Sequence, residues 1–227
     1  MKFIVIGLGY FGSKLAINLT NQGHEVIGID NRPGRIEELK DSISIVMDMD
    51  TTTEKAVRSL PLDDTDAVIV GIGEDVGSSI LTLAILKKLN VKRIIGRAIS
   101  PLHQNILTHI GISEIVHPEE ETAFSVGSML QLSSALKITE LDADNVIAEL
   151  YVPKKYAEHN LESINMQKRF DLRLLAVKTY PHEKKELPFQ DRNYQANLDF
   201  DNQKPLFSDD ILVVAGRLKN IKKLSGE

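Results

Sequence analysis

Short apolar runs alternate with amphipathic stretches through the first half of the chain. Runs rich in β-branched side chains lie at residues 3–6, 24–29, 44–47, 67–70, 91–96 and 114–116. Segments with helical spacing of apolar positions fall between them, at residues 13–22, 35–40, 52–59, 78–89 and 102–109. Nearly continuous apolar strands are buried on both faces, as in a parallel sheet covered by helices. We therefore predict an α/β fold in which residues 1–118 form a doubly wound, parallel six-stranded sheet of the Rossmann type.

The pattern changes at Glu119. Residues 119–141 carry apolar groups at helical spacing on more than one stripe, which predicts a crossover helix that contacts more than its own sheet. A further covering helix of the first domain is the alternative. Polar, turn-forming residues at 142–145 then break the pattern, and we place a domain boundary there.

Strand-like runs dominate the remainder, so residues 142–227 are predicted to form a small α+β lobe. The expected elements are strands at 146–152, 172–179 and 211–215, a short helix at 161–167, a charged hairpin turn at 181–188 and a long loop at 190–204.

Composition narrows the classes of partner. The 227 residues are 42% hydrophobic, which is enough for a real core. A net charge of −5 without a long Lys/Arg block argues against nucleic acid and against an anionic membrane surface as partners. No apolar run approaches the roughly 18 to 20 residues that span a bilayer, so we expect a soluble chain without membrane insertion. The absence of cysteine excludes disulfides and thiolate zinc sites and fits a cytosolic protein.

A glycine-rich signature, GLGYFG at residues 7–12, follows the first apolar run directly. In a dinucleotide-binding βαβ unit, Gly7 would allow the tight turn, Gly9 the approach of a pyrophosphate, and Gly12 the close packing of helix on strand. Asp30 ends the second apolar run, where an acid binds ribose hydroxyls. The motif therefore predicts an adenine nucleotide site that includes Gly7, Gly9, Tyr10, Phe11, Gly12 and Asp30.

Other candidates lie at the carboxyl ends of the predicted strands, where an open α/β sheet binds its ligand. We expect the site to be completed by Asn31, Arg32, Asp48, Met49, Gly71, Ile72, Gly73 and Arg97.

Each of these candidates also has a structural reading. Asp48 could bind an adenine amino group, itself or through the main chain that follows it, or could be an acid before a helix. Gly71 and Gly73 could let the backbone pass close to a ribose, or could simply form a turn. Arg97 suits polyphosphate charge, but could make only an ion pair. Arg32 could reach a 2′-phosphate, as in NADP sites, or could be a solvated loop residue.

Catalytic chemistry is missing from the sequence. Neither HExxH, GxxxxGK[ST] nor GxSxG occurs, and we find no histidine with an arranged acidic partner. A hydride-transfer enzyme needs an acid, a base or a polarising cation beside the nicotinamide. We therefore expect a nucleotide-binding protein that is not an enzyme.

Four segments together resemble the RCK (regulator of K⁺ conductance) family, and more narrowly the cytosolic regulatory subunits of Trk/Ktr-type bacterial potassium uptake systems. They are residues 4–12, 24–30, 111–119 and 206–216. The resemblance implies ATP, ADP or NAD(H) in the first lobe, dimers that assemble to an octameric ring, and a separate potassium-translocating membrane subunit. It implies a cytoplasmic protein at the inner face of the membrane that controls potassium transport by a ligand-dependent conformational change. It also implies that Glu119 coordinates a divalent cation; an acid at a helix start is the alternative reading.

The chain departs from the family pattern at three places. Tyr10 stands where several Ktr-type proteins have arginine, which puts recognition of a terminal phosphate in doubt. Gln167 lies near an arginine associated with cyclic di-AMP in some members, so we do not predict that ligand. The loop at 190–204 also looks longer than usual. Two other functions stay open, a small NAD(P)-dependent oxidoreductase and a nucleotide sensor that regulates another partner.

Overall fold

The computed structural model describes residues 1–179 and 194–226. The chain divides into two compact units, residues 1–120 and 121–227, each considered by itself below. The expected hairpin at 181–188 lies outside the described residues.

The first unit holds the predicted parallel six-stranded sheet, in the order β3-β2-β1-β4-β5-β6. Its strands are β1 Lys2–Ile6, β2 Glu25–Asp30, β3 Ile45–Asp48, β4 Ala67–Val70, β5 Ile94–Arg97 and β6 Glu114–Val116. Its helices are α1 Tyr10–Asn21, α2 Pro33–Leu39, α3 Glu54–Val57, η1 Leu62–Asp64, α4 Val76–Lys88 and α5 Pro101–His109. The fold class predicted from the apolar runs is confirmed, with element ends shifted by a few residues.

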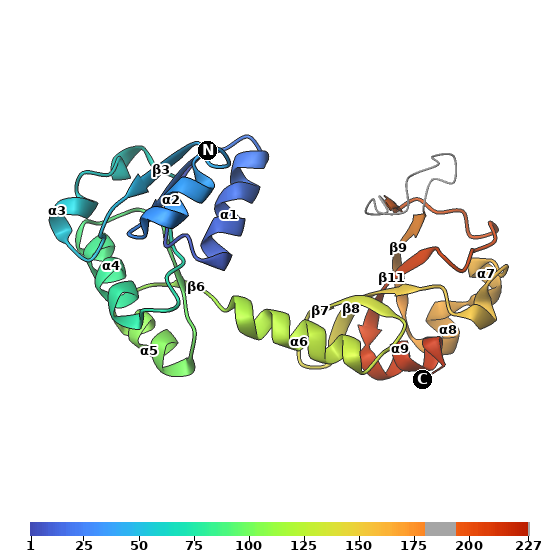
Figure 1. Cartoon of the computed structure of the whole chain (residues 1–227). Helices are drawn as coiled ribbons and strands as arrows, with labels where there is room; N and C mark the ends of the chain where they lie inside the picture. Colours follow the sequence, from blue (N-terminus) through green and yellow to red (C-terminus); the bar gives the residue numbers. More distant parts are fainter. Residues whose placement is uncertain (180–193, 227) are drawn as a thin grey trace. The chain divides into compact units, whose positions relative to one another are not determined.

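The sheet is buried on both faces because successive side chains of each strand point to opposite sides. In β1, Ile4 and Ile6 enter one core cluster, which includes Leu83 of α4. Phe3 and Val5 enter the other, with side chains of α1 and α2. Helices therefore cover both faces, as in a doubly wound fold (Figure 1).

The strand order reverses at β1, which pairs in parallel with β2 on one side and β4 on the other. Connections leave these strands toward opposite faces of the sheet, so their carboxyl ends border the crevice in which such folds bind ligands. The glycine-rich turn after β1 and the turn after β4 meet there.

The second unit is built on a five-stranded antiparallel sheet in the order β10-β9-β11-β8-β7. Its strands are β7 Ala135–Glu140, β8 Asn145–Tyr151, β9 Arg173–Thr179, β10 Gln195–Asn197 and β11 Ile211–Arg217. Its helical segments are η2 Lys154–Tyr156, α7 Leu161–Ile164, α8 Met166–Phe170 and α9 Leu218–Ser225. A single core cluster joins the sheet to α7, α8 and α9 through Leu150, Ile164 and Ile221.

The helix expected over residues 119–141 is shorter than predicted. Helix α6 spans Pro118–Leu130, and the chain then forms β7, which pairs with β8. Ile138 falls within the expected helix, but its side chain lies buried in the core beside the sheet. Pairing with β8 outweighs local helical spacing here. The turn at Asp142–Asn145 is therefore a hairpin connection inside the second unit, where the Asp142 carboxylate accepts from the Asn145 amide at 2.9 Å.

Three smaller expectations also change. The helix at 161–167 is split into α7 and α8 by Asn165, whose φ of 47° is left-handed. The part of the expected 190–204 loop that the structure describes contains β10. Helix α9 was not predicted, although its apolar and lysine positions alternate with helical spacing.

Candidate functional site

The glycine-rich turn needs glycine at two positions for steric reasons. Gly7 has a φ of +87°, and a Cβ placed on it would lie 2.7 Å from Ile72 Cγ1 and 2.9 Å from the Ile72 amide nitrogen. A Cβ on Gly12 would overlap the Gly7 carbonyl oxygen. The turn after β1 is therefore packed tightly against the turn after β4 and against the first residues of α1.

Gly9 is different because the space beside it is open. It is the N-cap of α1, with φ −60° and ψ −171°, so its backbone suits any residue. A Cβ on Gly9 would meet a single atom within 4 Å, Nη2 of Arg32 at 4.0 Å. The α1 N-terminus has no side-chain cap. Free N–H groups at a helix start beside an open glycine form an arrangement that accepts a phosphate.

Asp30 closes this turn from the end of β2. Its carboxylate is buried, and Oδ2 accepts from the Leu8 amide at 2.8 Å. Oδ1 accepts from the Arg32 amide at 3.0 Å and from Arg32 Nε at 2.8 Å, and Oδ2 accepts from Arg32 Nη2 at 2.9 Å. Burial raises the pKa of Asp30, but the hydrogen bonds from Arg32 and Leu8 outweigh burial and hold the pKa below its ordinary value. Asp30 is thus an ionised group whose charge Arg32 already balances.

Arg32 reaches from β2 toward the far side of the crevice. Its Nη1 lies 3.3 Å from the Glu74 carboxylate, just beyond the turn after β4. Arg32 is about half exposed, whereas the Glu74 side chain is almost fully exposed. The Arg32 guanidinium therefore lies across the place where the sequence predicts a ribose.

Arg97 occupies the other half of the crevice. From the end of β5, its Nη1 donates to the Gly71 carbonyl at 3.1 Å, and its guanidinium lies 5.6 Å from the centre of the Phe11 ring. A Cβ on Gly73 would lie 2.7 Å from Arg97 Cζ, so the glycine makes room for the cation. Arg97 also pairs with Glu119. Arg97 therefore lies where a cation could meet polyphosphate charge, and it also makes the ion pair that was the alternative interpretation.

Glu119 lies at the start of α6, within the first unit. Burial raises the pKa of Glu119, but the hydrogen bond and the charge of Arg97, together with a backbone hydrogen bond, outweigh burial and leave the pKa lowered. Among residues 1–179 and 194–226, no group of three His, Cys, Asp or Glu side chains is arranged to hold a metal ion. A divalent cation at Glu119 would thus need ligands from a bound phosphate or another molecule.

The remaining candidates are less closely involved. Asp48, at the end of β3, is exposed and pairs in register with Asp30, while the Met49 amide donates to the Asp30 carbonyl at 3.0 Å. Asn31 is exposed at the turn after β2. Tyr10 projects outward at 79% exposure. Within the described part of the chain, no hydrogen bond or ion pair joins these side chains to Asp30, Arg32 or Arg97.

Two residues of the crevice were not predicted. Glu74 faces Arg32, and no sequence signal marks it. Asp75 caps α4, where its carboxylate accepts from the Ser78 amide at 3.0 Å. An aspartate directly before the first apolar residues of a helix is an N-cap signal that the sequence does carry.

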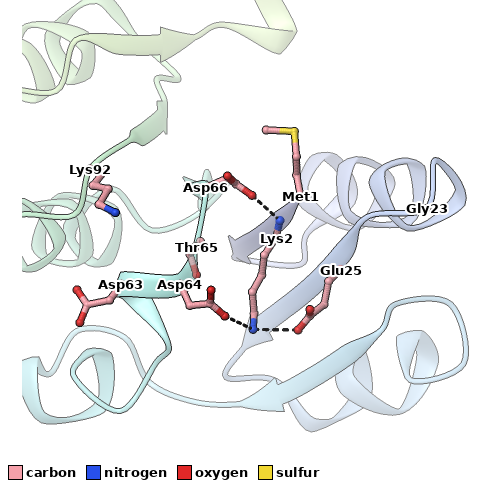
Figure 2. A pocket seen from close by; sticks show the side chains of 9 residues that line it. All are labelled: Met1, Lys2, Gly23, Glu25, Asp63, Asp64, Thr65, Asp66 and Lys92. Carbon is pink, nitrogen blue, oxygen red and sulfur yellow. Dashed lines mark hydrogen bonds and ion pairs between the residues drawn. The ribbon is translucent and has the colours of Figure 1, made fainter.

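A separate hollow of about 590 Å³ lies at the amino ends of the strands, away from the glycine-rich turn. Figure 2 shows its charged side chains, with Lys2 linked to Glu25 at 3.0 Å and to Asp64 at 3.2 Å. The Lys2 amide also donates to Asp66 at 2.7 Å. Ligands of open α/β sheets bind at the opposite, carboxyl ends, so the candidate site is the crevice beside Gly9.

Fold and crevice together define a nucleotide-binding domain of the Rossmann type. A model of the TrkA-N domain matches residues 3–118. Ktr system potassium uptake protein C of Bacillus subtilis (strain 168) is 32% identical over 177 residues, which cover 78% of this chain and 80% of that protein. The chain belongs to the TrkA-N domain family.

Solved structures show the same fold at lower identity. The GsuK channel bound to NAD matches all of this chain with a TM-score of 0.63 at 17% identity, and the match covers 39% of that channel chain. The GsuK RCK domain matches 99% of this chain with a TM-score of 0.53 at 18% identity, over 46% of that chain. The resemblance to RCK proteins drawn from the sequence is confirmed. Across the described residues, the structure has no helix both long and apolar enough to span a membrane.

Proposed function

We propose that this chain is a nucleotide-binding regulatory subunit that controls potassium uptake through a separate membrane subunit. The observation that carries the proposal is the identity of 32% with a Ktr potassium uptake protein over 80% of that protein's length. The glycine-rich turn and the uncapped N-terminus of α1 support the proposal that the chain binds a nucleotide. The chain would act by changing shape rather than by catalysis, at the inner face of the membrane.

The ligand we propose is ATP, ADP or NAD(H), bound over the first turn. The α1 N-terminus and Gly9 would receive the phosphates, because amide dipoles there favour negative charge. Asp30 would orient the ribose, and Arg97 would balance phosphate charge from the opposite strand end. The residues proposed to line the site are Gly7, Gly9, Tyr10, Phe11, Gly12, Asp30, Asn31, Arg32, Asp48, Met49, Gly71, Ile72, Gly73 and Arg97.

We also propose that Glu119 takes part in binding a divalent cation when phosphates are present. Glu119 can supply one carboxylate ligand to the cation, and in the structure this carboxylate forms an ion pair with Arg97. Phosphate oxygens would both attract Arg97 and supply the missing ligands, since divalent cations commonly bind between carboxylates and substrate phosphates.

The assembly we propose is a ring of eight chains built from dimers. Helix α6 supports it, because Phe124, Val126 and Leu130 are 38%, 48% and 83% exposed on the isolated chain. Apolar side chains gathered on one helix mark a contact surface. To shift the populations of two ring conformations from 1:99 to 99:1, the ligand must bind one conformation more tightly by about 5.5 kcal/mol in total. Shared among eight sites, this is roughly 0.7 kcal/mol for each site.

Potassium uptake tests the proposal. The chain would be co-expressed with a Ktr-type membrane subunit in cells that lack other potassium uptake, and uptake would be measured with and without Gly9→Ala. We expect uptake to require the wild-type chain and to fall with the variant. Unchanged uptake without the chain would refute the proposal, as would nicotinamide turnover by the purified protein, which the oxidoreductase alternative predicts.

A further inference from the structure

Lysines and arginines are paired very differently in the two units. Within residues 1–120, eight of the twelve form ion pairs with acids. Among the twelve that the structure describes in the second unit, one does so with a described acid, Lys178 with Glu149 at 2.6 Å. Acids are not scarce there, because residues 121–227 carry slightly more of them than of cations. The second unit therefore presents many cations that no described acid neutralises in an ion pair.

Seven of these cations gather on three neighbouring segments, η2, α8 and α9. Helix α8 packs against α9 (Figure 1). Nζ of Lys155, in η2, lies 3.4 Å from the Lys223 carbonyl oxygen of α9. Lys155 and Arg169 of α8 both lie over the Tyr156 ring, 5.0 and 5.8 Å from its centre. We call this surface the basic face; its members, all exposed except for the half-buried Lys222, are Lys154, Lys155, Lys168, Arg169, Lys219, Lys222 and Lys223.

Helix stability accounts for only part of the basic face. Lys222 and Lys223 lie in the last turn of α9, where a cation interacts favourably with the helix dipole. Lys219 lies in the first turn, where the same dipole disfavours a cation. Lys219 and Lys223 are about 6 Å apart along the helix axis. This is less than the screening length of about 8 Å at physiological salt, so the three charges act together on a partner.

The make-up of the face indicates the kind of partner. The apolar side chains of α9, Ile221 and Leu224, are buried in the core of the second unit, so the helix offers charge to solvent rather than apolar surface. Six of the seven cations are lysines, a residue type that is depleted in protein–protein interfaces. Clusters of four to eight basic residues on an amphipathic helix are, in contrast, typical of surfaces that bind anionic lipid headgroups.

We propose that the basic face binds anionic phospholipid headgroups at the inner surface of the membrane, through charge and without insertion of apolar side chains. The net charge of −5, from which a membrane surface was not expected as a partner, averages over both units and does not describe this face. The inference adds a lipid contact to the proposed function and rests on that function only for the location of the chain.

Vesicle sedimentation tests the inference with the whole chain, without nucleotide or membrane subunit. The chain should bind vesicles of phosphatidylcholine that contain about one third phosphatidylglycerol, and should not bind vesicles of phosphatidylcholine alone. Raising the salt from about 0.1 M to about 0.5 M should release it, because the charges are then screened. Each cation near an anionic surface contributes roughly a factor of five to binding. The variant that combines Lys219→Gln, Lys222→Gln and Lys223→Gln should therefore bind at least tenfold more weakly.

The matched control makes the same change in net charge on the first unit. It combines Lys14→Gln, Lys55→Gln and Lys87→Gln, three exposed lysines that form no ion pair among the described residues. This control should bind the anionic vesicles within twofold of the wild type. Circular dichroism spectra that match the wild type confirm that each variant is folded.

Three results would overturn the inference: no binding to the anionic vesicles, equal binding to both kinds of vesicle, or equal loss of binding in the α9 variant and the control. A DNA duplex that binds the chain as tightly as the anionic vesicles, at equal phosphate concentration, would overturn the choice of lipid as the partner. Because vesicle binding involves neither nucleotide nor the membrane subunit, its failure leaves the proposed function standing. Failure of the potassium uptake test would likewise leave vesicle binding unchanged.

Discussion

Gly7 and Gly9 should respond differently to replacement by alanine. Gly7→Ala would put a Cβ 2.9 Å from a backbone nitrogen of Ile72, at a φ of +87°. A left-handed conformation costs a non-glycine residue about 1–2 kcal/mol, and overpacking adds about 1–3 kcal/mol. Together these predict a loss of about 3 kcal/mol in the stability of the first unit.

Gly9→Ala should leave the fold nearly unchanged. Its φ is −60°, and the new Cβ would come no closer than 4.0 Å to another group. Replacing glycine by alanine at an N-cap costs about 0.5–1 kcal/mol. The same methyl group would, however, occupy the space in which we place the phosphates. We therefore expect nucleotide affinity to fall at least tenfold, which is about 1.4 kcal/mol.

Hydrogen–deuterium exchange of peptides from β1 and α1 measures the stability of the first unit alone. A loss of 3 kcal/mol corresponds to exchange about 100-fold faster in Gly7→Ala, whereas Gly9→Ala should exchange within about fivefold of the wild type. Isothermal titration measures the affinity of Gly9→Ala. The reasoning is refuted if Gly9→Ala binds nucleotide as well as the wild type, or if Gly7→Ala is as stable as Gly9→Ala.

Three further predictions follow from the charged and buried groups. Because the pKa of Asp30 is lowered on folding, its contribution to stability is present above its ordinary value of 3.8 and lost as pH falls; urea unfolding of Asp30→Asn should show a shallower loss between pH 5 and 3, and an unchanged slope would contradict this. Burial lowers the pKa of His103, so the folded chain should lose stability as pH falls below the ordinary value of 6.5. His103→Leu should remove this dependence in urea unfolding while the exposed control His109→Gln keeps it, and equal slopes in both would contradict it. Glu119→Gln frees Arg97 from its ion pair and should tighten ATP binding in EDTA but weaken any enhancement by Mg²⁺; titrations in which Mg²⁺ acts alike on both proteins would exclude Glu119 as a cation ligand.

The first unit was predictable because its signals are local and mutually consistent. Continuous apolar strands, helical spacing between them and a glycine turn after β1 all specify one doubly wound sheet. The positions of Gly7, Gly9 and Asp30 in the turn follow from the same spacing. Because parallel strands need crossover connections, strands that alternate with helices along the chain indicate a parallel sheet.

The second unit was less predictable because antiparallel pairing depends on partners far apart in sequence. Residues 135–140 lie in the stretch 119–141 from which a helix was predicted, and pairing with β8 makes them a strand. The same limit applies to the site. The sequence places Arg32 and Arg97 near strand ends. It does not reveal that Arg32 pairs with Asp30 or that Glu119 pairs with Arg97. Such pairs depend on side-chain geometry that spacing does not encode.

Equilibrium dialysis of the whole chain against radiolabelled ATP, ADP, NAD⁺, NADH and NADPH tests the central claim most directly. Occupancy of the crevice by an adenine nucleotide predicts saturable uptake of at least one of them, to one molecule per chain, that unlabelled nucleotide displaces and Gly9→Ala weakens. Equal concentrations on both sides of the membrane for all five nucleotides, at millimolar ligand and with Mg²⁺ present, would contradict it.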